Sequence, residues 1–111
     1  MFHTELADRW HTFSIFEQMG NIGAEVGRSI NWKKKAKTDM SRNATYRALE
    51  LIDFTVADPK NKNSLKEILR MREVFLDYIM GDNVYKSTEK DWEKYFYHFA
   101  IAARSVTINN V

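Results

Sequence analysis

The sequence predicts an all-α fold, an antiparallel four-helix bundle with up-down-up-down connectivity, on three observations. Apolar residues recur at intervals of three and four along four long segments, which places them on one face of a helix. The 111 residues include one proline and four glycines, and no stretch alternates apolar and polar residues as a half-buried strand does. The connections between the segments are about four to seven residues long, which favours antiparallel neighbours.

The first predicted helix spans residues 13–35. Ser14 and Glu17 have the spacing of a capping box at its start, in which each side chain accepts from the other residue's backbone N–H. Ahead of this helix we expect an extra helical turn around Leu6 and Trp10. The inward face of the helix is the set spaced three and four residues apart, Phe16, Met19, Gly23, Val26 and Ile30.

The second and third predicted helices span residues 40–58 and 64–80. The second helix ends before Pro59, because the residue that precedes a proline is pushed out of the helical backbone conformation. The third begins at Ser64 and Glu67, which again have capping-box spacing.

The fourth predicted helix spans residues 88–104. Thr88 and Asp91 supply a weaker capping signal at its start. The residues after Arg104 give no clear signal and are assigned to a tail. The aromatic core of the third and fourth helices is predicted to include Phe75, Phe96 and Phe99.

The composition indicates a single globular domain, residues 1–111, with a cytoplasmic location. The chain has no cysteine, which excludes a disulfide framework, a zinc–thiolate centre and a cysteine nucleophile. We expect neither a signal peptide nor a membrane partner, because no run approaches the roughly 20 apolar residues of a membrane span. The three histidines lack metal-ligand spacing and no glycine-rich phosphate loop is present, so no catalytic residue, metal or cofactor is predicted.

Two features of the first helix bear on binding. Gly20, Gly23 and Gly27 each cost roughly 1 kcal/mol relative to alanine inside a helix, so close approach of another backbone is expected to offset that cost. We favour packing against another helix of the same chain over contact with a second subunit or a ligand. A polar face lies beside the glycines and is either solvated, a buried network or a binding face; its residues are Gln18, Asn21, Glu25 and Arg28.

A basic loop follows the first helix. An aromatic ring beside four lysines could stack on a base and neutralise phosphates, or the loop could simply be solvated. The net charge of the chain is only +2, and the predicted topology places this loop at the same end as the acidic loop 81–87. The candidate nucleic-acid contacts are Trp32, Lys33, Lys34, Lys35 and Lys37.

Carboxylates on the second and third helices could converge, and paired carboxylates in a bundle can hold magnesium or manganese. The sequence does not decide whether they meet; the four residues are Glu50, Asp53, Glu73 and Asp77. Glu50-x-x-Asp53 resembles the second half of the motif of magnesium-dependent MazG-type nucleotide pyrophosphohydrolases, whose first half is not matched because Arg28 stands where that family has a second acid.

Five stretches together resemble a small uncharacterised all-helical family of archaea and anaerobic bacteria, to which no activity is assigned; they are residues 13–32, 48–62, 65–77, 81–83 and 95–104. More remotely, Asn21-Ile22-Gly23-x-Glu25 followed by Arg28 is similar to the four-helix proteins encoded by ribosomal-RNA intervening sequences and to accessory proteins of diversity-generating retroelements. Those proteins form oligomeric basic bundles, and the retroelement type binds nucleic acid.

The interpretation that best fits these observations is a non-enzymatic helical-bundle binding module. We expect it to be a homo-oligomer that self-associates, with an accessory role in a nucleic-acid system as an extension of that function. The alternative is a magnesium-dependent MazG-like nucleotide pyrophosphohydrolase.

Overall fold

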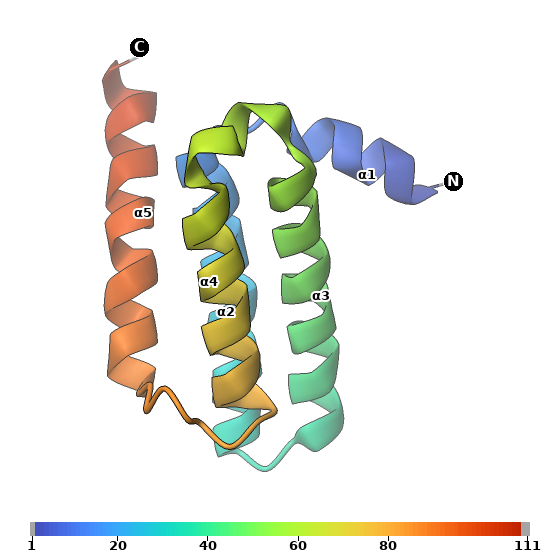
Figure 1. Ribbon diagram of the computed structural model, residues 1–111, viewed down its shortest axis with the longest axis vertical. Helices are drawn as coiled ribbons and strands as arrows, with labels where there is room; N and C mark the ends of the chain where they lie inside the picture. The colour runs from blue at the N-terminus through green and yellow to red at the C-terminus, as the bar shows by residue number, and fades with distance from the viewer. Residues whose placement is uncertain (1, 110–111) are drawn as a thin grey trace.

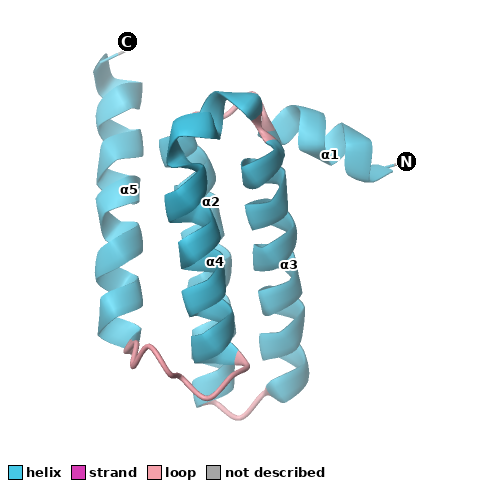
Figure 2. Ribbon diagram, in the orientation of Figure 1, coloured by secondary structure: helices cyan, strands magenta, loops and turns pink. Residues whose placement is uncertain are grey.

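The computed structural model describes the backbone of residues 2–109 and the side chains of residues 5–104. Within that range the chain is all-α, with five α-helices, one short 3₁₀ helix and no strand (Figures 1 and 2). None of the helices in the described range is long and apolar enough to cross a membrane. The elements are α1 (Phe2–Trp10), α2 (Ile15–Lys34), α3 (Thr38–Ala57), η1 (Pro59–Ser64), α4 (Leu65–Ile79) and α5 (Glu89–Asn109).

Helix α2 lies at the centre of the fold and packs closely on both α3 and α5, while α4 packs on α3. Helix α1 extends sideways from the end of the molecule where η1 lies (Figure 1). The loop after α2 and the loop after α4 lie together at the opposite end, where Lys34 Nζ is 3.0 Å from a Glu89 carboxylate oxygen. The basic and acidic loops therefore share one end, as the sequence predicts.

The core is formed where the apolar faces of the helices meet. Phe75 of α4 is fully buried and contacts Trp92 of α5 edge to face, with 5.8 Å between ring centroids. Trp92 in turn stacks on Phe96 at 6.0 Å. Helix α2 contributes a buried row spaced three and four residues apart, and α4 contributes a second; they are Met19, Ile22, Val26 and Ile30, and Ile68, Met71, Phe75 and Ile79.

Two of the three predicted helix caps are present. Ser14 and Glu17 form the predicted capping box at the start of α2. Thr88 and Asp91 exchange equivalent bonds of 3.0 and 3.1 Å at the start of α5. The predicted cap at Ser64 is wrong, because the Ser64 side chain makes no capping hydrogen bond. The 3₁₀ helix η1 leads directly into α4, and the N–H of Leu65 donates to the carbonyl of Lys62 in η1.

Besides η1, two regions are more helical than the sequence predicts. The extra turn expected near Trp10 is a nine-residue helix, α1, which is anchored by a 2.8 Å bond from the Trp10 indole N–H to Thr55 Oγ1. The assignment of residues after Arg104 to a tail is also wrong, since α5 continues to Asn109. No glycine or proline interrupts this stretch, and extending an existing helix adds a hydrogen bond for each residue fixed.

We expect Phe75→Ala to lower the free energy of unfolding by about 3–5 kcal/mol, because it leaves a cavity in the core. Phe96 is also buried, whereas Phe99 is only partly buried, so Phe99→Ala should cost less. Urea denaturation of the two variants beside the parent measures both effects. A cost below about 1 kcal/mol for Phe75→Ala would contradict the burial described above.

Candidate functional site

A groove of about 350 Å³ runs between α2 and α5. Its base is apolar and includes Val26 and Ile30 of α2 with Trp92 and Phe96 of α5, all of them buried. Small residues line the α2 side because three glycines recur there at helical spacing. Few side chains therefore project from α2 into the groove, and the α2 backbone lies close to its surface.

The three glycines of this groove occupy different environments. A Cβ atom at Gly23 would lie 2.7 Å from both Cβ and Cγ of Phe96, so α5 packs directly on the α2 backbone at this point. A Cβ atom at Gly20 or Gly27 would have no neighbour within 4 Å. The predicted packing within the chain is thus present at Gly23, while Gly20 and Gly27 border open space.

An exposed aromatic side chain of α5 lines the same groove, and an exposed apolar one follows it on that helix. Tyr97, which lines it, is 63% exposed, and Ile101 is 38% exposed one helical turn further along α5. Phe16 of α2 is also 36% exposed, but it lines a different recess, together with Ser64 and Phe99. Tyr97 is not among the predicted site residues, although its four-residue spacing from Ile101 was a signal for an apolar strip beside the core face.

The predicted polar face of α2 is divided by the fold. Gln18 is fully buried, whereas Asn21 and Arg28 are exposed. Asn21 Nδ2 donates to the Glu17 carbonyl at 2.8 Å, and Glu25 pairs with both Arg28 and Arg47, the latter at 3.2 Å. Gln18 therefore belongs to the interior and the other three residues to the surface.

Gln18 is the centre of a buried polar network. Its Nε2 donates to the Trp10 carbonyl at 3.0 Å and to Asp58 Oδ2 at 2.9 Å, and its Oε1 accepts from Asn61 Nδ2 at 2.8 Å. Lys60 Nζ pairs with Asp58 from the solvent side. Burial by itself would raise the pKa of Asp58, but hydrogen bonds from Lys60 and Gln18 and the charge of Lys60 outweigh it and hold that pKa below its ordinary value of 3.8.

The network joins α1, α2 and η1, so its role is structural. Asp58 and Asn61 are not among the predicted site residues. The signal for them is local: an Asp directly before a proline is typical of a helix N-cap, and Asp58 accepts from the Lys60 N–H at 3.2 Å.

The lysines of the predicted basic loop make contacts within the chain, and the structure places two of them, Lys33 and Lys34, in the last turn of α2 rather than in a loop. Lys33 Nζ donates to the Ile79 carbonyl at 2.8 Å, Lys34 pairs with Glu89, and Lys35 Nζ lies 5.4 Å from the centroid of the Trp32 ring. Lys37 is exposed. The last turn of α2 is thus joined to the end of α4 and the start of α5, and part of its positive charge lies against an acid.

The four carboxylates of α3 and α4 have separate partners or positions. Asp53 pairs with Arg72 at 3.0 Å, and Glu73 accepts from the Tyr85 hydroxyl at 2.9 Å. Asp77 accepts from the backbone N–H groups of residues 84 and 85 at 2.9 and 3.0 Å, while Glu50 is partly buried on α3. Among the side chains of residues 5–104, no three His, Cys, Asp or Glu residues gather as a metal site would require.

Asp58→Asn should weaken the dependence of the free energy of unfolding on pH in acid. Because the folded-state pKa of Asp58 is depressed, its stabilisation is present above the ordinary value and is lost as pH falls through the folded pKa. The variant should be about 1–3 kcal/mol less stable at pH 7 and should show a flatter pH dependence below pH 4. Urea denaturation between pH 2 and 7, with exposed Asp53→Asn as the control, tests this; identical pH profiles for Asp58→Asn and the parent would contradict it.

Gly23→Ala should destabilise the fold although alanine favours helix, because the added methyl group meets Phe96. Gly20→Ala is the matched control and should raise the stability of the monomer by up to about 1 kcal/mol, since nothing lies near its Cβ position. Denaturation at low protein concentration compares the two variants. Equal gains in stability would show that α5 does not hold the α2 backbone at Gly23.

The groove between α2 and α5 is the place where open glycines, a buried apolar base and an exposed tyrosine occur together. The family resemblances of the sequence stay predictions. Comparisons of the chain with protein-family models, with curated proteins and with solved structures find no match.

Proposed function

We propose that this chain is a non-enzymatic binding module that associates with a second copy of itself through the groove between α2 and α5. We further propose that α2, α3, α4 and α5 act as an antiparallel four-helix bundle, with α1 as an addition at one end. The close packing of α2 on α3 and α5 and of α4 on α3 supports this arrangement. So do the connections, which lie at alternating ends in Figure 1.

The observation that carries the proposal is the open space above Gly20 and Gly27. Each glycine costs roughly 1 kcal/mol relative to alanine in a helix. Gly23 is explained by its contact with Phe96, but outside their own stretch of α2 no atom of the described chain lies within 4 Å of the Cβ positions of the other two. A second helix that packs on this face would come close to the α2 backbone. The methyl group of an alanine at position 20 or 27 would obstruct that approach.

A second copy of the chain suits this face because the face is self-complementary. In a two-fold symmetric dimer the same patch occurs on both subunits, so the patch must carry both a projection and a recess. Tyr97 is the projection, since most of its side chain is exposed, and the space beside Gly20 and Gly27 is the recess. Exposed Ile101 extends the apolar area along α5.

The charged residues give less support to the other functions. Asp53, half of the motif that resembles the pyrophosphohydrolases, is paired with Arg72. In the basic loop, Lys33, Lys34 and Lys35 contact a carbonyl, an acid and an aromatic ring of their own chain. Binding through the apolar groove therefore has the stronger physical basis.

Tyr97→Ser should lower the mass in solution. The parent should approach twice the 13.1 kDa chain mass as its concentration rises, and Tyr97→Ser should remain near 13.1 kDa, because the substitution removes the projection. Tyr46→Ser is the matched control, since Tyr46 is 54% exposed on α3, away from the groove. Multi-angle light scattering over a concentration series measures all three.

Two results would contradict the proposal. One is a parent that stays monomeric at its highest soluble concentration. The other is a pair of variants, Gly20→Ala and Gly27→Ala, that melt at higher temperature than the parent with unchanged mass, because these glycines would then be open surface.

A further inference from the structure

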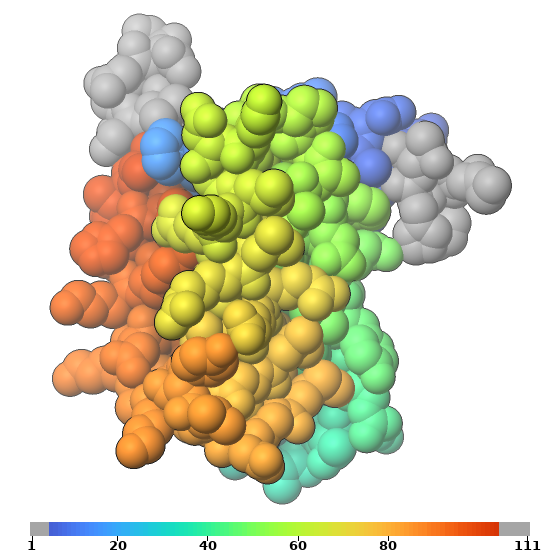
Figure 3. Space-filling view, viewed as in Figure 1, coloured from blue at the N-terminus to red at the C-terminus, as the bar shows by residue number. Residues whose placement is uncertain are grey.

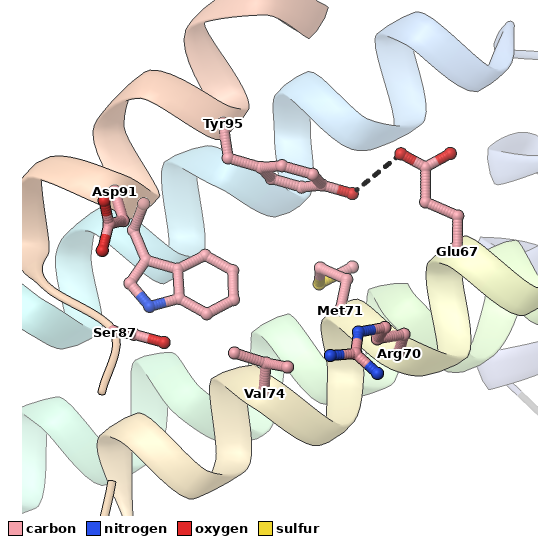
Figure 4. A pocket seen from close by; sticks show the side chains of 8 residues that line it. Glu67, Arg70, Met71, Val74, Ser87, Asp91 and Tyr95 are labelled. Carbon is pink, nitrogen blue, oxygen red and sulfur yellow. Dashed lines mark hydrogen bonds between the residues drawn. The ribbon is translucent and has the colours of Figure 1, made fainter. Parts of the chain in front are cut away.

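A second recess, separate from the α2–α5 groove, opens between α4 and α5 on the face shown in Figure 3. Its volume is about 270 Å³. Its walls are apolar, with Met71 and Val74 from α4 and Trp92 and Tyr95 from α5 (Figure 4). Neither helix closes over it, because α5 packs chiefly on α2.

The recess wall contains a buried donor without an acceptor. Trp92 is 6% exposed, and among the side chains of residues 5–104 its indole Nε1 is the buried polar atom that has no hydrogen-bond partner. A buried unsatisfied donor costs about 1–3 kcal/mol. The fold meets this requirement elsewhere, since the equally buried Trp10 indole donates to Thr55 at 2.8 Å.

The charges at the mouth of the recess are mixed in sign. Glu67 and Asp91 lie on α4 and α5, and Arg70 lies beside them on α4, with its guanidinium 5.6 Å from the centroid of the Tyr85 ring. An anion would meet the two acids and a cation would meet Arg70, so an uncharged molecule fits better than either.

Tyr95 adds a hydroxyl group that already has a hydrogen-bond partner. Burial, followed by the charge of Glu67 and their hydrogen bond, raises the pKa of Tyr95, so its hydroxyl stays neutral at physiological pH. The hydroxyl donates to Glu67 at 3.4 Å, as the dashed line in Figure 4 shows. The Trp92 N–H is therefore the donor in the wall that still needs an acceptor.

We propose that this recess binds a small uncharged aromatic molecule of one or two rings that carries a hydrogen-bond acceptor. The rings lie against Trp92, Met71 and Val74, where flat and sulfur-containing surfaces favour aromatic contact. The acceptor takes the Trp92 N–H. Asn83 holds the backbone of the lining residue Ser87 through two hydrogen bonds, of 2.9 and 3.0 Å, so it is the Ser87 side chain that turns to admit the acceptor.

The test uses quinolin-2-one, a neutral two-ring compound with a carbonyl acceptor, and indole, a two-ring compound that donates a hydrogen bond through its N–H but has no such acceptor. Each is titrated into the ¹⁵N-labelled full chain, and the three indole N–H resonances are assigned with Trp10→Phe and Trp32→Phe. We expect quinolin-2-one to shift the Trp92 resonance in a saturable way. Indole should bind about five-fold more weakly, the equivalent of one neutral hydrogen bond.

Two variants locate the binding. Val74→Phe fills the recess and should abolish the shift, while Leu69→Phe, at an exposed position of the same helix, should leave it unchanged. If Val74→Phe does not fold, Trp92→Phe decides instead, with binding followed by the backbone amide resonances of residues that line the recess, because loss of the N–H should remove the preference for quinolin-2-one over indole. Titration of Tyr97→Ser separates this site from self-association, since the recess does not include Tyr97.

The proposal is overturned if quinolin-2-one gives no saturable shift at its solubility limit. It is also overturned if indole binds as tightly as quinolin-2-one, or if folded Val74→Phe binds like the parent.

Discussion

The contact between Gly23 of α2 and Phe96 of α5 is the constraint on which the rest of the structure depends. A methyl group at Gly23 would overlap Phe96, so α5 lies closer to α2 at this point than an alanine there would allow. Phe96 in turn stacks on Trp92, which contacts Phe75 of α4. The position of α5 on α2 thereby sets where the central aromatic residues meet.

Both candidate binding surfaces follow from that contact. On one side, α5 and α2 leave a groove whose open ends are at Gly20 and Gly27, above and below the point of contact. On the other side, α5 packs chiefly on α2 and only loosely on α4. Side chains of α4 and α5 do not fill the space between these two helices, and a recess remains beside Trp92. Trp92 lines both surfaces, and its buried N–H has no hydrogen-bond partner among the described residues.

The sequence predicts the features that depend on local spacing and leaves open those that depend on tertiary contacts. The capping residues Ser14 and Thr88 and the close packing at Gly23 follow from spacing and helix propensity, and the all-α class follows from periodicity. Helix α1 does not, because Trp10 is anchored by residues more than forty positions away. Gln18 lies on the predicted polar face and yet is buried, since its partners come from α1 and η1.

A double-mutant cycle between Gly23 and Phe96 tests the central contact most directly. The free energy of unfolding is measured by urea denaturation for the parent, Gly23→Ala, Phe96→Ala and the double variant. If the two residues contact each other as described, Gly23→Ala should cost less once Phe96 is truncated, because Phe96→Ala removes the Cγ and Cδ1 atoms that lie 2.7 and 2.8 Å from the Cβ position and leaves only the Phe96 Cβ, with a coupling energy of about 0.5–3 kcal/mol. Costs that simply add would contradict the account, because α5 would then not be held against the α2 backbone at Gly23.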